Sequence, residues 1–99
     1  MNKKLLREGP YADFFSQGVQ VGNMLTLAGQ IGIDADGNIP EDIKGQMVIC
    51  YENIKNVLKE FNASLDNVID ETWFVTDVED CMNNVGDIFA ERERIYGCK

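Results

Sequence analysis

The chain has 99 residues, 44% of them hydrophobic and 26% charged, which is enough for one domain with a single core. Its net charge of −8 argues against a nucleic-acid-binding surface, because such a surface needs a basic face. The chain contains no histidine, which excludes Ser-His and Cys-His catalytic pairs and most zinc sites.

Targeting and redox signals point to the cytoplasm. No apolar run approaches the roughly 20 residues of a membrane-spanning helix, and the basic start of the chain lacks the apolar core of a signal peptide. The three cysteines, Cys50, Cys81 and Cys98, show neither CxxC nor another metal-binding spacing, which is typical of reduced cytosolic thiols. We therefore expect a cytoplasmic protein that has no membrane partner and holds no metal.

The first predicted structure is a β-hairpin over residues 17–34, after a lead-in of residues 1–15. The alternating residues Val19 and Val21 are followed by Gly22-Asn23, and alternation then resumes around Leu25. Both turn residues tolerate a positive φ, so the pair predicts a tight turn between two strands.

A Gly29-Gln30 pair follows the second predicted strand. Glycine weakens the interior of a strand, so the pair indicates either a β-bulge or a place where another group approaches the backbone. The residues themselves leave both interpretations open. Residues 34–38 then predict a turn rather than a calcium loop, because the glutamate that ends such a loop is absent.

A long amphipathic helix is predicted from about Pro40 to residues 62–64. Its apolar residues recur at intervals of three and four, as one helical face requires. The stripe consists of Ile43, Met47, Cys50, Tyr51, Ile54, Val57, Leu58 and Phe61.

The rest of the chain predicts one more strand and one more helix. Residues 72–76 are dense in β-branched and aromatic side chains, which favours a strand. Residues 77–80 offer N-caps for a second helix that runs to Tyr96, with Arg92 and Arg94 on its solvated face. The predicted order is ββ-α-β-α in a single α+β domain over residues 1–99, whose sheet lacks a last strand or two.

Several short motifs occur in order between residues 9 and 80. They are Gly9-Pro10-Tyr11, Ala28-Gly29-Gln30-Ile31, Gly37-Asn38-Ile39-Pro40, Glu52-Asn53-Ile54-Lys55-Asn56-Val57-Leu58 and Trp73-Phe74-Val75-Thr76-Asp77. Their composition and spacing resemble the reactive-intermediate deaminase family (RidA/YjgF).

The resemblance implies a chorismate-mutase-like fold, with two helices on one face of a mixed sheet. It implies a homotrimer with small-molecule clefts between subunits. It also implies hydrolysis of enamine or imine acids, such as 2-aminoacrylate, to keto acids and ammonia without metal or cofactor. Older family names suggest nucleic acid, which the net charge of −8 supports little.

The same resemblance implies a substrate cleft lined by Tyr11, Ala28, Gly29, Gln30 and Phe89. Tyr11 is equally consistent with a subunit interface, and Ala28 replaces the usual serine and so supplies no hydroxyl. The family arginine that grips the substrate carboxylate lies in strands beyond residue 99, so the catalytic residues are unassigned. Two functions stay open: a cofactor-free deaminase, or a non-catalytic trimer that binds a small metabolite or a partner.

Overall fold

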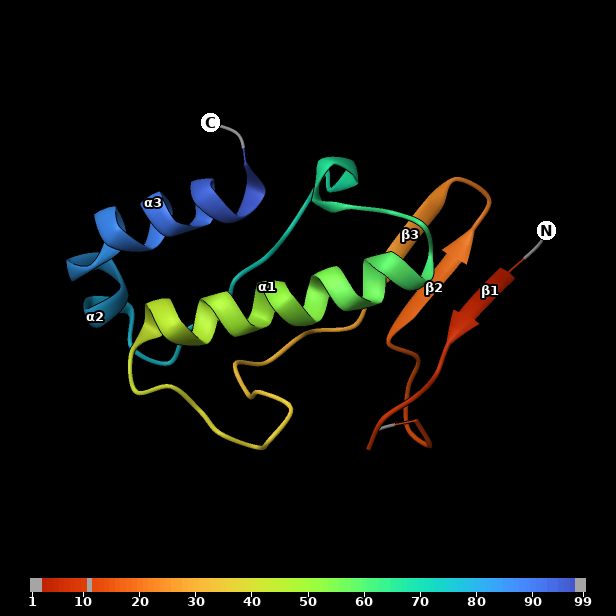
Figure 1. Ribbon diagram of the computed structural model, residues 1–99, viewed down its shortest axis with the longest axis horizontal. Helices are drawn as coiled ribbons and strands as arrows, with labels where there is room; N and C mark the ends of the chain where they lie inside the picture. Colours follow the sequence, from red (N-terminus) through yellow and green to blue (C-terminus); the bar gives the residue numbers. More distant parts are fainter. Residues whose placement is uncertain (1–2, 11, 98–99) are drawn as a thin grey trace.

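A computed structural model describes residues 3–10 and 12–97 of the chain (Figure 1). The molecule is elongated, 45 × 31 × 20 Å, with a small β-sheet at one end and a pair of helices at the other. The elements in chain order are β1 (Lys3–Leu6), β2 (Gly18–Val21), β3 (Met24–Leu27), α1 (Ile43–Glu60), the short 3-10 helix η1 (Leu65–Asn67), α2 (Val78–Asn83) and α3 (Val85–Tyr96). This set of strands and helices confirms the expected α+β class.

The sheet has three antiparallel strands in the order β1-β2-β3. β2 and β3 form the predicted hairpin, which turns at Gly22 with a φ of +58° and pairs Val21 with Met24. β1 lies in the segment interpreted as a lead-in, so that interpretation was wrong. Its residues do not alternate in polarity, and they become a strand because the free edge of β2 supplies backbone partners, with Leu6 opposite Gly18.

The strand predicted over residues 72–76 is not formed, and this part of the prediction was wrong. Within the described residues no strand lies beside the segment, and Phe74 is 92% exposed. β-branched and aromatic residues favour a strand only where a neighbour pairs with the backbone and covers one face. The described sheet is therefore antiparallel rather than mixed, and no strand separates α1 from α2.

α1 begins and ends where its sequence signals lie. Asp42 caps the helix by accepting a 3.0 Å hydrogen bond from the amide of Gly45, and the chain leaves the helix through Asn62 at a φ of 58°. The predicted stripe is the buried face, since Met47, Tyr51, Val57, Leu58 and Phe61 are each less than 9% exposed. The periodicity therefore identified the residues that form the core.

α1 joins the two ends of the molecule. Its C-terminal turns lie on the sheet, where Phe61 packs against Gly18, and α3 runs beside its N-terminal half (Figure 1). Ile88 of α3 is fully buried against this half. The predicted second helix is interrupted at Asn84, which ends α2 and precedes α3. None of the described helices is both long enough and apolar enough to cross a membrane.

Replacing Gly18 with alanine is expected to lower the free energy of unfolding by about 1–3 kcal/mol, as overpacking does. A Cβ there would lie 2.7 Å from Phe61 Cε2 and 3.2 Å from Val57 Cγ1, both on buried side chains. Gly86→Ala in α3 is the control, since its Cβ would meet nothing within 4 Å and should stabilise the helix by about 0.5–1 kcal/mol. Urea unfolding followed by circular dichroism measures the free energy of unfolding of both variants. No change in this free energy for Gly18→Ala would contradict the packing of Phe61 against Gly18.

Candidate functional site

Residues 28–30 form a short bend directly after β3. The amide of Ala28 donates to the carbonyl of Gln17 at 2.9 Å, and the side-chain amide of Gln30 donates back to the carbonyl of Ala28 at 3.1 Å. Because β3 ends at Leu27, Gly29 lies beyond the strand and is not a bulge within the sheet. The close approach of another group stays a prediction.

The backbone at Gly29 is open. Gly29 is exposed, and a Cβ built there would meet nothing within 4 Å. Among the hydrogen bonds of the described residues, none uses the amide N–H of Gly29 or of Gln30. Two adjacent backbone donors are therefore available to water or to a ligand with acceptor oxygens.

The segment that carries these donors is fastened to α1. The thiol of Cys50 lies 3.5 Å from the carbonyl oxygen of Gln30, and Asn53 Nδ2 donates to the carbonyl of Ile31 at 3.2 Å. Gly32 lies so close to Gln46 that a Cβ would come within 2.7 Å of its Cβ. Burial raises the pKa of the Cys50 thiol, which is therefore protonated and unreactive at neutral pH.

Phe89 lies apart from residues 28–30. It is 47% exposed on α3 and stacks on Trp73, with ring centroids 5.6 Å apart and an interplanar angle of 5°. Among the hydrogen bonds and ring contacts of the described residues, none joins Phe89 to Gly29 or Gln30. Tyr11, the remaining predicted cleft residue, lies outside the described residues. Of the predicted cleft residues that the structure describes, the fold thus brings together Ala28, Gly29 and Gln30, and Phe89 is not among their hydrogen-bond or ring partners.

A polar cluster that the sequence analysis missed lies between α1 and α3. We call it the Glu71 cluster: Glu71 accepts hydrogen bonds from Tyr51 Oη at 2.9 Å, Arg92 Nε at 2.8 Å and Tyr96 Oη at 2.7 Å. Arg92 Nη2 lies 2.7 Å from the same carboxylate, and the Arg92 guanidinium also covers the Tyr96 ring, 4.5 Å from its centroid. The cluster ties the segment after η1 to both helices.

The prediction that Arg92 belongs to the solvated face was wrong. Arg92 follows the fully buried Ile88 by four residues and precedes Tyr96 by four, so all three share one face of α3. This spacing was the signal that could have found the residue. Glu71 carried no comparable signal, because only the folded chain brings it to α3.

The ionisation of the cluster follows from its contacts. Burial raises the pKa of Glu71, but the hydrogen bonds from Tyr96, Arg92 and Tyr51 lower it by more, so the net shift is downward. Burial and the Glu71 carboxylate both raise the pKa of Tyr96. At neutral pH the cluster therefore holds one carboxylate, one guanidinium and two protonated tyrosines. It clamps the fold together and offers no group that exchanges protons near pH 7.

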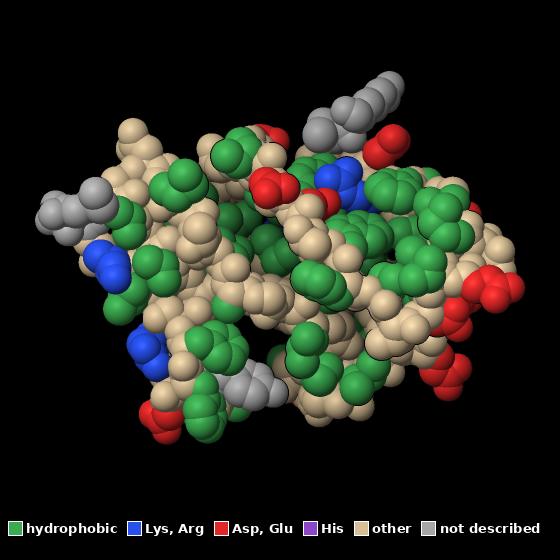
Figure 2. Space-filling model, turned by 180° about the vertical axis from the view of Figure 1, so that it is seen from behind, with side chains coloured by type: hydrophobic (Ala, Val, Ile, Leu, Met, Phe, Trp, Pro, Cys, Tyr) green, Lys and Arg blue, Asp and Glu red, His purple; other side chains and the backbone are tan. Residues whose placement is uncertain are grey.

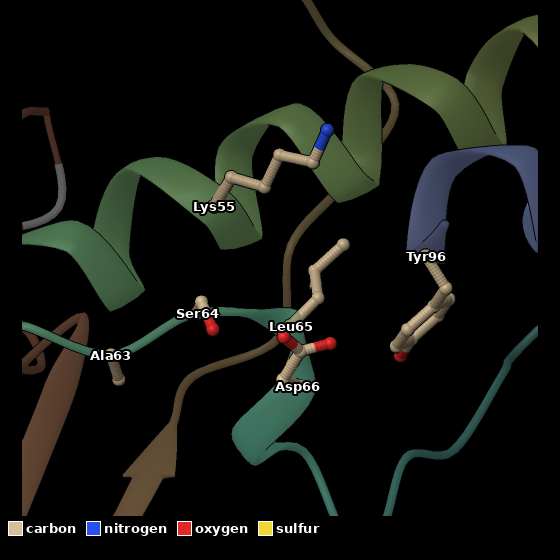
Figure 3. A pocket seen from close by; sticks show the side chains of 6 residues that line it. All are labelled: Lys55, Ala63, Ser64, Leu65, Asp66 and Tyr96. Atoms are coloured by element: carbon tan, nitrogen blue, oxygen red, sulfur yellow. The ribbon is translucent and has the colours of Figure 1, made fainter. Parts of the chain in front are cut away.

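Two adjoining hollows lie beside this cluster. Their volumes are about 320 and 340 Å³, and both are lined by Leu65, Asp66 and Tyr96. Figure 3 shows the first, with Lys55 reaching over it from α1 and Asp66 opposite. Their size is at the lower end for a small-molecule site. Within the described residues, no three His, Cys, Asp or Glu side chains gather closely enough to hold a metal ion.

Known proteins resemble most of this chain. The family described as Endoribonuclease L-PSP matches residues 7–94. A RutC family protein of Pyrococcus abyssi is 40% identical over 90 residues, which cover 89% of this chain and 61% of that protein. TdcF of Escherichia coli K12, named as a candidate reactive intermediate deaminase, is 36% identical over 73 residues, or 73% of this chain and 54% of TdcF.

Solved structures show the same fold. The crystal structure of RidA from the Antarctic bacterium Psychrobacter sp. PAMC 21119 superposes with a TM-score of 0.70 at 26% identity. The match covers 87% of this chain and 68% of that one. The curated relatives named above are longer, and the chain spans less than two thirds of their length.

Proposed function

Because this chain belongs to the Endoribonuclease L-PSP family of RidA/YjgF-like proteins, we propose that it contributes to hydrolysis of small enamine or imine acids, such as 2-aminoacrylate, to keto acids and ammonia. The name of TdcF supports this reaction class. The observation that carries the proposal is the open bend at Gly29 and Gln30, with two free amide donors on a segment anchored to α1.

The proposed reaction needs little from the protein beyond positioning. An enamine acid first becomes the imine, as its terminal carbon gains a proton and its nitrogen loses one. Water then adds to the carbon of the C=N bond and the nitrogen takes up one of its protons. The resulting carbinolamine passes its hydroxyl proton to the nitrogen and loses ammonia as the C=O bond forms. Backbone N–H groups that point at the substrate carboxylate or at a developing oxyanion would hold the acid in place and lower the barrier. The Gly29 and Gln30 amides are suited to this work because glycine leaves the approach to them open.

A second function, binding without catalysis, is favoured by the lack of a hydroxyl at Ala28 and of a free arginine among the described residues. Ala28 supplies no hydroxyl, and the described arginines are already engaged: Arg92 with Glu71, Arg94 with Glu91, and Arg7 with the carbonyl of Ala12. A substrate carboxylate is best held by a free guanidinium. In this second function the chain by itself binds a small metabolite through the same amides but does not accelerate its hydrolysis.

The proposal includes an assembly and a location. A homotrimer would place the bend of one subunit opposite a neighbour and so explain why nothing in one chain lies within 4 Å of a Cβ built at Gly29. The free thiols of Cys50 and Cys81 suit a reducing cytoplasm. Nucleic acid is a poor partner for a chain of net charge −8.

The test is ammonia release from 2-aminoacrylate generated in situ. We expect the chain to accelerate release over buffer, and Gly29→Val to reduce that acceleration at least about tenfold by covering the two amides. Ala35→Val, in an exposed turn, is the control and should leave the rate unchanged. No acceleration, but saturable NMR shifts of residues 28–31 on addition of pyruvate, would support the binding function. If neither faster ammonia release nor saturable NMR shifts were observed, both functions would be overturned.

A further inference from the structure

Asn53 of α1 holds the backbone that follows the Gly29-Gln30 bend. Its Nδ2 donates to the carbonyl of Ile31 at 3.2 Å and lies 3.5 Å from the carbonyl of Ile33, so one carboxamide reaches two residues of the same segment. The bond to Ile31 is the stronger one, because 3.5 Å is long for a hydrogen bond from nitrogen to oxygen. The chain between β3 and α1 runs along the side of α1 (Figure 1). A side chain of the helix thus supplies donors that a neighbouring strand would supply in a sheet.

Two further residues of α1 keep the segment against the same face of the helix. The thiol of Cys50 donates to the carbonyl of Gln30 at 3.5 Å, and Gly32 leaves no room for a Cβ beside Gln46. Gln46, Cys50 and Asn53 follow one another at intervals of four and three residues, which places them on one helical face. A thiol is a weak donor, so Asn53 is the stronger of the two hydrogen-bonding side chains.

These contacts decide which way the neighbouring amides point. The C=O and N–H groups of a trans peptide unit point in opposite directions. The carbonyl of Gln30 faces Cys50 on α1, so the N–H of Ile31 points away from the helix. The carbonyl of Ala28 is held by Gln30 Nε2 at 3.1 Å, which fixes the direction of the Gly29 N–H as well. Among the described residues no hydrogen bond uses the Ile31 N–H, so Ile31 adds a third open donor to the bend.

Fixed backbone donors matter in this molecule because side-chain cations are scarce. The chain has nine Lys and Arg against seventeen Asp and Glu, and Figure 2 shows few basic side chains on the face that it presents. The described arginines are engaged with acceptors of their own. A carboxylate ligand then depends on backbone amides, which bind an anion well when they are already aimed at it.

We propose that Asn53 is a positioning residue for this backbone. It fixes residues 30–33 on α1 and so keeps the N–H of Ile31 aimed away from the helix, beside those of Gly29 and Gln30, to receive the carboxylate of a small acid. Without Asn53, the weak Cys50 contact is the remaining hydrogen bond from α1 to this segment among the described residues. The peptide units can then rotate, and the donors lose their common direction. The role in binding rests on the proposed function, but the orientation of the amides is measurable without a ligand.

The first measurement is the orientation of these amides, by residual dipolar couplings in solution NMR. In Asn53→Ala the couplings of residues 30–32 are expected to change, while those of α1 stay as in the wild type. Asn53→Asp keeps the size of the side chain but replaces its N–H donors with carboxylate oxygens, so it should have the same effect. Asn56→Ala is the matched control, since Asn56 is an exposed asparagine of α1 whose side chain makes no hydrogen bond among the described residues. Circular dichroism checks that each variant is folded.

The second measurement is the affinity for pyruvate, a keto acid with one carboxylate, from titration of the same amide signals. Asn53→Ala and Asn53→Asp should bind pyruvate at least about tenfold more weakly than the wild type, because misplaced donors no longer meet the carboxylate together. Asn56→Ala should match the wild type.

Unchanged couplings of residues 30–32 in Asn53→Ala would overturn the proposal. Wild-type couplings in Asn53→Asp would do so too, since the N–H donors of Asn53 would then have no part in holding the segment. Changed couplings together with a wild-type affinity for pyruvate would also contradict it. A wild type that neither binds pyruvate nor accelerates ammonia release would defeat the proposed function, and the couplings alone would then decide whether Asn53 positions this backbone.

Discussion

Ile88→Ala is expected to lower the free energy of unfolding by about 3–4 kcal/mol, a large part of the 5–15 kcal/mol typical of a small domain. Ile88 is fully buried and belongs to the cluster formed with Met47, Tyr51, Leu58 and Leu65. Because this cluster holds α3 against α1, the cavity has few ways to collapse. Urea unfolding at neutral pH gives the value directly.

Met82→Ala is the matched control for this prediction. Met82 is 60% exposed on α2, so its truncation should change the free energy of unfolding by less than about 1 kcal/mol. Equal losses in the two variants would mean that α3 does not pack on α1 as described. A small loss for Ile88→Ala alone would show that the site relaxes around alanine.

Glu71→Gln is expected to destabilise the protein by about 2–3 kcal/mol at neutral pH. It leaves Arg92 without its ion pair and replaces charge-assisted hydrogen bonds from two tyrosines with weaker ones. Both partners of the ion pair are partly exposed, at 30% and 24%, which keeps the loss below that of a fully buried pair.

The same variant should change how stability depends on pH. The folded state lowers the pKa of Glu71 below its ordinary value of 4.5, so the unfolded chain takes up this proton more readily. The contribution of Glu71 is therefore complete above about pH 5 and is lost as the pH falls through 4.5 toward the folded-state value. On the alkaline side, the raised pKa of Tyr96 makes its contribution complete below the ordinary value of 10, and it is lost above that pH.

Thermal unfolding across the acid range checks this expectation. The wild type should lose stability more steeply than Glu71→Gln as the pH falls, and the two curves should converge. Glu93→Gln, an exposed residue in the same region of α3, should follow the wild-type slope. A Glu71→Gln curve parallel to that of the wild type at every pH would contradict the assignment of the acid-sensitive step to Glu71.

The predictions from sequence held where neighbouring residues carry the interaction. The stripe of α1 follows from 3.6-residue periodicity, its start from the Asp42 side chain, and the hairpin from the positive φ of Gly22. They failed for β1 and for residues 72–76, because a strand exists only where a second strand presents its backbone. They failed for Arg92, whose partner Glu71 lies 21 residues away in the chain.

The candidate site divides in the same way. The Gly29-Gln30 motif identified an open backbone, since the lack of a side chain on glycine is a property of the residue itself. Only the packing of α3 on α1 decided where Phe89 lies and brought the residues of the Glu71 cluster together. The sequence by itself determined the helical faces, the turns and the family, because these depend on residues a few positions apart. The tertiary structure decided which strand-like segments pair within the described residues, because pairing depends on a neighbour that is remote in sequence.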